Sequence, residues 1–483
     1  MAMQISHEIQ EPVEVPASAA IPTKGRHTSL SSFARYREKR RFWSDPVGYM
    51  SQRYLNEGAV SAFGAEHPEY VFAFAPELNK QLNENAALFY WSGSRKWTRP
   101  PSSLSILRAS IGNMDGQEYQ VRKALMRPAF HHDVIEGARD KMISRTDEML
   151  SRWSNNGFRD VHLEIRKLVH AISMAAVLGV EDQDKVDSLY RLIDDIYTGS
   201  GRPLVMLLPY DLPLFPFRKV VRTADKIIGL MRSIIQQKQR NGGASSDMLS
   251  MLMHSKTEQG VTLSETELIS ETYNIMGHDT TISALIWMLI LIAIHPQVQA
   301  KMVEELSGKL RGGAPTLADL NQLTYLDAVI KEGMRLMPPQ CFSRRFNVEP
   351  CRLGHYDLPA RTIIFMSSYI THRIPDLYSQ PLRFVPERWD TLKPGPYEYF
   401  PFGSGVHYCV GRAFALLEMK IVLAMTLQRY KLSFVPGQRI DRMPGARLLL
   451  SPKGAVAMKI EKHDGRFSPP QVQGDILQMV ALN

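Results

Sequence analysis

The chain has 483 residues, 44% of them hydrophobic and 22% charged, which are the proportions of a globular protein large enough to enclose a cofactor. Its formal net charge is +9, but the densest basic stretch, residues 35–41, is too short for a nucleic-acid-binding surface. Three cysteines cannot form a disulfide framework in a chain of this length, so we expect a cytoplasmic protein in a reducing setting.

The first residues have the composition of a leader. Residues 1–26 are rich in Pro, Glu, Ala and Ser and contain no apolar run of the kind found in signal peptides. We therefore expect a disordered leader over residues 1–26 and a single domain over residues 27–483. Within that domain, residues 90–112 are irregular around Pro100 and Pro101, and a loop of this length in a compact protein is often functional.

Helical patterns dominate from residue 115 to residue 239 and are interrupted by the proline-rich segment 208–217. The longest predicted helix covers residues 264–294 and ends just before Pro296. Its most apolar run, residues 282–294, has thirteen residues, whereas a helix that crosses a bilayer needs about 20. The run therefore predicts a buried core helix, and no membrane anchor is expected.

The rest of the chain mixes helices with short strands. Residues 325–337 carry apolar side chains at helical spacing, and residues 411–430 predict a last long helix. Strand-like segments occur at residues 362–367, 448–450 and 455–460. Many helices with a minority of short strands predict a mainly α (α+β) fold, helix-rich with small β-sheets.

The most informative segment surrounds Cys409. A glycine-rich turn that begins at Phe402 precedes the cysteine, and Gly411 follows it at the start of the last long helix. A thiol at a helix N-terminus is favoured as thiolate by the helix dipole and by free backbone N–H groups. The glycine also allows the backbone to approach a flat group closely. A lone cysteine is usually a small buried hydrophobe, but this frame favours a ligand.

The frame formed by Phe402, Gly405, Cys409 and Gly411 resembles that of the cytochrome P-450 family, over nearly the whole chain. The resemblance implies the single-domain fold of that family and a haem-thiolate monooxygenase. In such an enzyme Cys409 is the axial ligand to the iron of haem b, and Phe402 contacts the haem. The family often has arginine two residues before the cysteine, where this chain has His407. The resemblance implies that His407 reaches a haem propionate, with a charge that depends on pH.

A pair of charged residues supports the same family. Glu332 and Arg335 are spaced i, i+3, so both lie on one face of a helix and can form an ion pair. When this spacing occurs by itself in a sequence, it usually marks an ion pair on the solvated surface. The resemblance adds Arg388 as the third member of a buried network that fixes the loop of Cys409, which is a structural role.

The longest helix contains Gly277, which costs about 1 kcal/mol relative to alanine in a helix interior. A helix kink is the simple explanation, and the resemblance implies instead a groove where dioxygen lies over the iron. It also matches Asp279 and Thr280 to the family's catalytic acid–alcohol pair, which supplies a hydrogen bond and protons to the oxygen. Met276 departs from the family's small residue, and it either narrows the pocket, turns away or approaches the iron as a thioether ligand.

Four further positions concern the propionates. Tyr119 and Lys123 match residues that hold propionates in the family, with Arg122 as the alternative to Lys123. Arg345, with Arg344 as its alternative, matches an arginine that contacts the other propionate. At each position a solvated basic residue is the competing interpretation.

The resemblance implies that one atom of O2 enters a hydrophobic small molecule by hydroxylation or epoxidation. Electrons would pass from NAD(P)H through a reductase and a ferredoxin or flavodoxin-type donor. The basic charge is then either a docking face for that donor or only a solvated surface. We expect a monomer with a role in secondary metabolism. A haem-thiolate peroxygenase or isomerase and a non-catalytic haem sensor are the alternatives.

The resemblance also implies which segments line the substrate pocket. They are largely apolar and comprise residues 97–111, 197–217, 274–281, 340–342 and 448–450.

Overall fold

A computed structural model of the chain describes residues 32–63, 68–91, 102–153, 157–200, 204–205, 208, 210–241, 247–276, 279–445 and 448–482. Several predictions of the sequence lie outside these residues. They are the leader over residues 1–26, Gly277, and the part of the pocket loop around Trp97.

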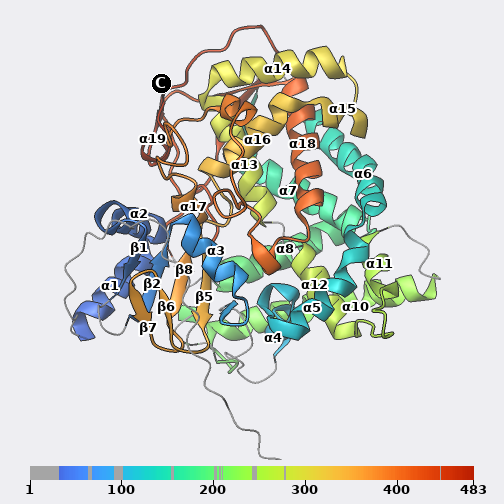
Figure 1. The fold of residues 1–483 in the computed structure, drawn as a ribbon. Helices are drawn as coiled ribbons and strands as arrows, with labels where there is room; N and C mark the ends of the chain where they lie inside the picture. The colour runs from blue at the N-terminus through green and yellow to red at the C-terminus, as the bar shows by residue number, and fades with distance from the viewer. Residues whose placement is uncertain are drawn as a thin grey trace, which may run out of the picture.

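Helices make up most of the described chain (Figure 1). Those of the first half are α1 (Ser32–Ser44), α2 (Pro46–Glu57), α3 (Pro76–Glu84), α4 (Ser103–Leu107), α5 (Gly116–Met126), α6 (His132–Ser151), α7 (Val161–Ser173), α8 (Gln183–Ser200) and α10 (Pro216–Arg240). Those of the second half are α11 (Met248–His254), α12 (Glu265–Met276), α13 (Asp279–Ile294), α14 (Pro296–Leu310), α15 (Leu317–Gln322), α16 (Thr324–Leu336), α17 (Ser368–Thr371), α18 (Arg412–Arg429) and α19 (Ile476–Met479).

Short helical turns connect several of these helices. The turns are η1 (Ile111–Asn113), η2 (Arg127–Phe130), the π-helical η3 (Met174–Leu178), η4 (Pro386–Asp390) and η5 (Gly405–His407). Local sequence explains many boundaries. Proline stands at the first position of α2, α3, α10 and α14, where its missing N–H costs nothing.

The largest sheet has five strands in the order β1-β2-β8-β5-β3. Its strands are β1 (Val60–Ala62), β2 (Tyr70–Ala73), β3 (Phe89–Trp91), β5 (Ser343–Asn347) and β8 (Ile363–Met366). β2 and β8 pair in parallel, and the other pairs are antiparallel. Strands from residues 60–91 and from residues 343–366 thus lie side by side, as the blue and orange arrows of Figure 1 show.

The remaining sheets are smaller. One has three antiparallel strands in the order β4-β11-β9, and two have only two strands, β6-β7 and β10-β12. These strands are β4 (Gly157–Asp160), β6 (Cys351–Leu353), β7 (Tyr356–Leu358), β9 (Lys431–Phe434), β10 (Gln438–Arg439), β11 (Ala457–Glu461) and β12 (Val472–Gln473). The expected mainly α fold with small sheets is confirmed.

The core is built around α13. Every residue from Thr281 to Ile294 is buried, because the helix is apolar on all sides and packs against α7, α14, α16 and α18. Within the described residues, one stretch, Glu265–Ile294, is long and apolar enough to cross a membrane by length and composition alone. Since 88% of its most apolar window is buried inside the protein, it matches the predicted core helix.

Residues 448–450 do not form the predicted strand. Leu449 makes only an isolated bridge to Gln340, and the Leu448 carbonyl accepts from the N–H of Cys341 at 3.1 Å. The Leu450 carbonyl accepts from the indole N–H of Trp287 on α13 at 2.7 Å. The Trp287 side chain on the buried helix α13 thus makes the hydrogen bond to Leu450 that a neighbouring strand would have made.

Candidate functional site

The loop that presents Cys409 is closed by its own backbone. The N–H of Cys409 donates to the Phe402 carbonyl at 2.9 Å, and the N–H of Gly403 donates to the Phe400 carbonyl at 3.0 Å. Gly405 has a positive φ of 65°, and a Cβ there would lie 2.9 Å from the Cβ of Asn83 on α3. A larger residue at position 405 would therefore separate this loop from α3.

Cys409 differs from the other two cysteines in its accessibility. Cys341 is buried and Cys351 is partly buried, whereas Cys409 is exposed. Burial by the surrounding loop still raises the pKa of the Cys409 thiol, and the N–H of Gly411 lowers it. The protein alone thus favours the thiol, and a metal ion that coordinates the sulfur is what would remove its proton.

Gly411 ends this loop. Its predicted role is to let the backbone approach a flat group closely, and contacts within the protein do not themselves require a glycine there. A Cβ at Gly411 would meet the Phe130 ring at 3.5 Å and the Cys409 sulfur at 3.9 Å, which are ordinary contacts. Gly411 precedes the first residue of α18, so Cys409 lies just outside that helix. Any need for a glycine at 411 must therefore come from a bound group.

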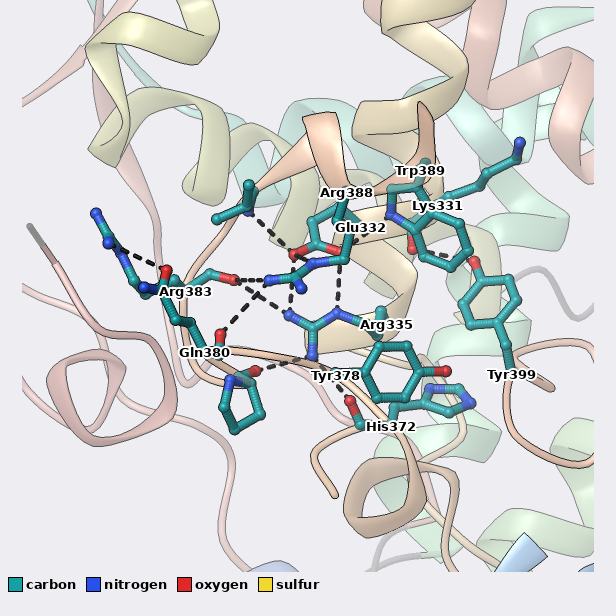
Figure 2. Close-up of polar contacts among 12 residues, drawn as sticks. Lys331, Glu332, Arg335, His372, Tyr378, Gln380, Arg383, Arg388, Trp389 and Tyr399 are labelled. Carbon is teal, nitrogen blue, oxygen red and sulfur yellow. Dashed lines mark hydrogen bonds and ion pairs between the residues drawn. The ribbon is translucent and has the colours of Figure 1, made fainter. Parts of the chain in front are cut away.

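The predicted charge network is present and buried (Figure 2). Arg335 donates to Glu332 from Nε and Nη2, both at 2.9 Å, and Arg388 donates to Glu332 from Nε at 2.9 Å. The side chains of Glu332 and Arg335 are fully buried. Glu332 also accepts from the Val385 N–H and from the Trp389 indole, each at 3.0 Å.

A contact that the sequence did not predict links this network to the cysteine loop. Arg335 Nη1 donates to the carbonyl of His372 at 2.8 Å, and His372 Nε2 accepts from the N–H of Phe400 at 3.0 Å. Burial lowers the pKa of His372 to about 3, so the ring stays neutral and Nε2 can accept. Phe400 in turn anchors Gly403. Continuous hydrogen bonds thus run from α16 to the loop of Cys409.

The predicted acid–alcohol pair begins α13. Thr280 is exposed and Asp279 is partly buried, whereas Met276 is only 1% exposed and belongs to the hydrophobic core. The burial of Met276 in the core favours the interpretation that its side chain turns away from the pocket. It offers no support for a thioether ligand.

Arg166 on α7 is a further charged neighbour of Asp279 that the sequence did not single out. Desolvation alone would lower the pKa of Arg166, but the charges of Tyr190, Asp194 and Asp279 raise it. Arg166 also forms an ion pair with Asp194 on α8. Helices distant in the sequence thus bring a cation to the candidate acid.

Two predicted propionate contacts hold the cysteine loop from its other side. The Tyr119 hydroxyl donates to the carbonyl of Val406 at 2.7 Å, and Lys123 Nζ donates to the same oxygen at 2.6 Å. His407 Nε2 lies 3.1 Å from Asp115 Oδ1, and its ring lies 4.3 Å from that of Tyr119. These residues therefore gather beside the cysteine.

Arg122, the alternative to Lys123 as a propionate contact, binds other residues. Arg122 is buried and forms ion pairs with Glu267 and with Glu271, the latter at 2.9 Å. It therefore fastens α5 to α12.

Arg345 is the buried cation of this region. It is 2% exposed, and its guanidinium lies 4.3 Å from the centre of the Trp91 ring. Desolvation lowers its pKa to about 10. Among the described residues it forms no ion pair, and it donates to the Asn83 side-chain oxygen at 3.2 Å and to the Arg344 carbonyl. A buried guanidinium without a carboxylate partner suits an anionic group.

The donor set therefore fits a haem. An accessible thiol lies on one side of the site, and a buried guanidinium, an ammonium and a phenol lie beside it. Such a set matches the iron and the carboxylates of that group.

Several segments that were expected to line a substrate pocket do lie together. Residues 339–342 bond to residues 448–450, and Trp287 of α13 joins them. On another side, α4 packs on α10 and α12, and the Ile111 N–H donates to Glu271 at 2.8 Å. Parts of residues 97–111 and 197–217 lie outside the described chain.

Comparison with known proteins gives consistent matches. The family model described as Cytochrome P450 matches residues 94–458. Putative cytochrome P450 139 from Mycobacterium bovis is 27% identical over 402 residues, which are 81% of this chain and 92% of the relative. Cyclooctat-9-en-7-ol 5-monooxygenase from Streptomyces melanosporofaciens is 28% identical over 406 residues, 82% of this chain and 87% of the relative. A solved structure described as retinoic acid bound cyanobacterial CYP120A1 has a TM-score of 0.76 at 21% identity and covers 92% of this chain and 100% of its own.

Proposed function

The chain belongs to the cytochrome P450 family and is a monooxygenase, and from this premise we propose that Cys409 binds the iron of haem b. The enzyme then inserts one atom of O2 into a hydrophobic small molecule by hydroxylation or epoxidation. The observation that carries the proposal is the accessible Cys409 sulfur in a loop that a buried charge network holds from α16. When bound, the haem supplies oxygen activation, and a cysteine ligand favours O–O cleavage.

In this proposal, different residues beside the cysteine bind the two carboxylates of the haem. We assign one carboxylate to Arg345, because it is buried and forms no ion pair among the described residues. We assign the other to Lys123, Tyr119 and His407, and binding it would require Tyr119 to give up its hydrogen bond to Val406. Phe402 holds the cysteine through its carbonyl. Gly277 lies outside the described residues, and its part in an oxygen groove stays a prediction of the sequence.

Asp279 and Thr280 are the proposed catalytic residues. The Thr280 hydroxyl is exposed at the start of α13 and can donate a hydrogen bond into the site. Asp279 holds a proton at its carboxylate and passes it toward Thr280 through water. The charge of Asp279 is one of the causes that raise the pKa of Arg166, so the two side chains lie close enough to interact.

We propose that electrons reach the site from a separate protein. The family uses redox partners, and we propose a ferredoxin or flavodoxin-type donor with a reductase that oxidises NAD(P)H. Lys123, Arg127 and Arg412 supply positive charge close to the cysteine loop, since Arg127 lies close enough to affect Lys123 and Arg412 lies over the Tyr408 ring. An acidic donor would find a complementary surface there.

The proposed substrate is hydrophobic and of medium or large size. Residues 448–450 are all leucine and α4 is mostly apolar, which supports a substrate of this kind. One relative acts on cyclooctat-9-en-7-ol, as its name states, which is consistent with a role in secondary metabolism. We also propose a cytoplasmic monomer with a leader over residues 1–26 and one haem domain over residues 27–483.

The absorption spectrum of the reduced, carbon-monoxide-bound protein tests the cofactor. A Soret band shifted far to the red is expected for a thiolate ligand, and its absence from folded, haem-loaded protein would contradict the assignment. Turnover is then tested with redox partners, NAD(P)H and labelled O2. Product that requires hydrogen peroxide instead of these partners would indicate a peroxygenase, and haem binding without any turnover would indicate a sensor.

A further inference from the structure

Arg108 is a cation that neither the fold nor the haem site uses. It follows the last residue of α4, in the segment that was expected to line a substrate pocket. Its backbone carbonyl accepts from the side-chain amide of Asn113 at 2.8 Å. Its guanidinium forms no ion pair and no hydrogen bond among the described residues. The main chain at Arg108 is therefore fixed, while its charge is left for another partner.

The segment that carries Arg108 is bound to α12, the helix that leads to the proposed catalytic residues. The Ser270 hydroxyl donates to the Ala109 carbonyl at 3.0 Å, and the N–H of Ile111 donates to Glu271 at 2.8 Å. Both contacts involve backbone groups of the segment, so they hold its main chain against α12 independently of the side chain of Arg108.

The guanidinium of Arg108 is surrounded by protein but still accessible. Arg108 is exposed, although Leu107 and Ser110 near it are only 1% and 3% exposed. Desolvation nevertheless lowers the pKa of Arg108, and the nearby Tyr273 on α12 acts against this effect. An arginine that projects into bulk water would keep its hydration. The guanidinium therefore lies inward beside α12, where a small molecule can still reach it.

Tyr273 relates Arg108 to the proposed catalytic residues. Burial raises the pKa of Tyr273 to about 12, and both Arg108 and Asp279 lie close enough for their charges to affect it. Tyr273 and Thr280 are seven residues apart in the stretch Glu265–Ile294. Seven residues are about two helical turns, or about 10 Å along the axis, and return to the same helix face.

We propose that Arg108 determines substrate specificity by binding the carboxylate of a hydrophobic acid, whose apolar part extends along α12 toward Thr280. A guanidinium can donate two parallel hydrogen bonds to a carboxylate. A neutral hydrophobic ligand would instead displace water from an unpaired charge, which is costly. The oxidised carbon should then lie roughly 10 Å from the carboxylate. The inference rests on the proposed function, because it takes Thr280 and Cys409 to border the place of oxidation.

The experiment compares two ligands of equal chain length, dodecanoate and the neutral dodecanamide. Isothermal titration calorimetry with the haem-loaded enzyme gives both dissociation constants. The wild type should bind dodecanoate at least about tenfold more tightly, as expected for hydrogen bonds to a charged group. Arg108→Gln keeps a polar side chain without the charge, and it should bring the two constants within about twofold of each other.

Arg240→Gln is the matched control. Arg240 is an exposed arginine in the last turn of α10, so its loss should leave the preference for dodecanoate unchanged. Two results would overturn the proposal. Equal binding of the acid and the amide by the wild type would mean that no cation receives the carboxylate. A preference that persists in Arg108→Gln would mean that a different residue receives it.

The product formed from dodecanoate supplies a test that requires no variant, should Arg108→Gln fail to fold. Oxidation in the half of the chain far from the carboxylate is expected, and oxidation at the carbon next to the carboxylate would also overturn the proposal. The carbon-monoxide spectrum of the same preparation tests the proposed function separately. A thiolate-type band without a preference for the acid would reject only the role of Arg108.

Discussion

Glu332→Gln is the substitution whose effect the structure defines best. Glu332 accepts from Arg335, Arg388, Val385 and Trp389, and its side chain is fully buried. Glutamine has almost the same volume but no charge, and its amide NH2 would face donors. The change leaves two guanidinium groups without their counter-ion, which costs about 3–5 kcal/mol for a buried pair.

This loss converts to a measurable change in the thermal midpoint. With an unfolding entropy of ~2.1 cal/mol/K per residue, a chain of this length has about 1 kcal/mol/K, so the midpoint should fall by roughly 3–5 °C. Circular dichroism gives the midpoint. The ratio of haem to protein and the carbon-monoxide spectrum report whether the loop of Cys409 still presents a thiolate, since His372 and Phe400 connect the network to it.

Glu387→Gln is the matched control. Glu387 lies in η4, the turn that also holds Arg388, and pairs with Lys301 at 2.6 Å, but its side chain is 40% exposed. Exposed pairs contribute about 0–1 kcal/mol, so this variant should lose no more than about 1 °C. The reasoning is refuted if Glu332→Gln has the midpoint and haem content of Glu387→Gln, because the buried network would then contribute no more than a surface pair.

Three other substitutions, the first with a control of its own, test the site and the core. Cys409→Ala should abolish the red-shifted carbon-monoxide band, while Cys351→Ala should leave it unchanged; a thiolate-type band in Cys409→Ala would reject the ligand assignment. Thr280→Ala should keep its haem but lose about tenfold or more of product per NAD(P)H, with the electrons recovered as hydrogen peroxide, because it removes a proton-relay hydroxyl; unchanged coupling would exclude Thr280 from the relay. Glu418 on α18 is fully buried without a hydrogen-bond partner among the described residues, and burial raises its pKa to about 8. Because the neutral form is the one that the fold favours, its contribution to stability is complete below about pH 4.5 and is lost as the pH rises toward 8. Urea unfolding of wild type and Glu418→Gln should therefore show a difference in unfolding free energy that changes by about 3 kcal/mol between pH 4.5 and pH 7, and parallel pH profiles would contradict a buried neutral carboxyl.

The alternatives left open by the sequence were separated by tertiary packing. Arg122 and Lys123 are neighbours on one helix, and periodicity cannot say which of them faces the cysteine loop. The acidic residues Glu267 and Glu271 of α12 bind Arg122, so Lys123 is the one that reaches the Val406 carbonyl. In the same way, the sequence indicates only that Asp115 precedes a helix, and the fold places it beside His407.

Cys409, the i, i+3 pair of Glu332 and Arg335, and the apolar helix that ends at Ile294 could all be identified from the sequence, because motif spacing and helical period are local properties. The sequence by itself therefore determined the family, the mainly α fold and the candidate ligand. Only the tertiary structure decided that His372 holds the loop of Cys409, that Asp115 lies beside His407 and that Arg345 is buried. The physical reason is that hydrogen bonds and desolvation at this site join segments far apart in the chain, and their strength depends on burial that no local pattern encodes.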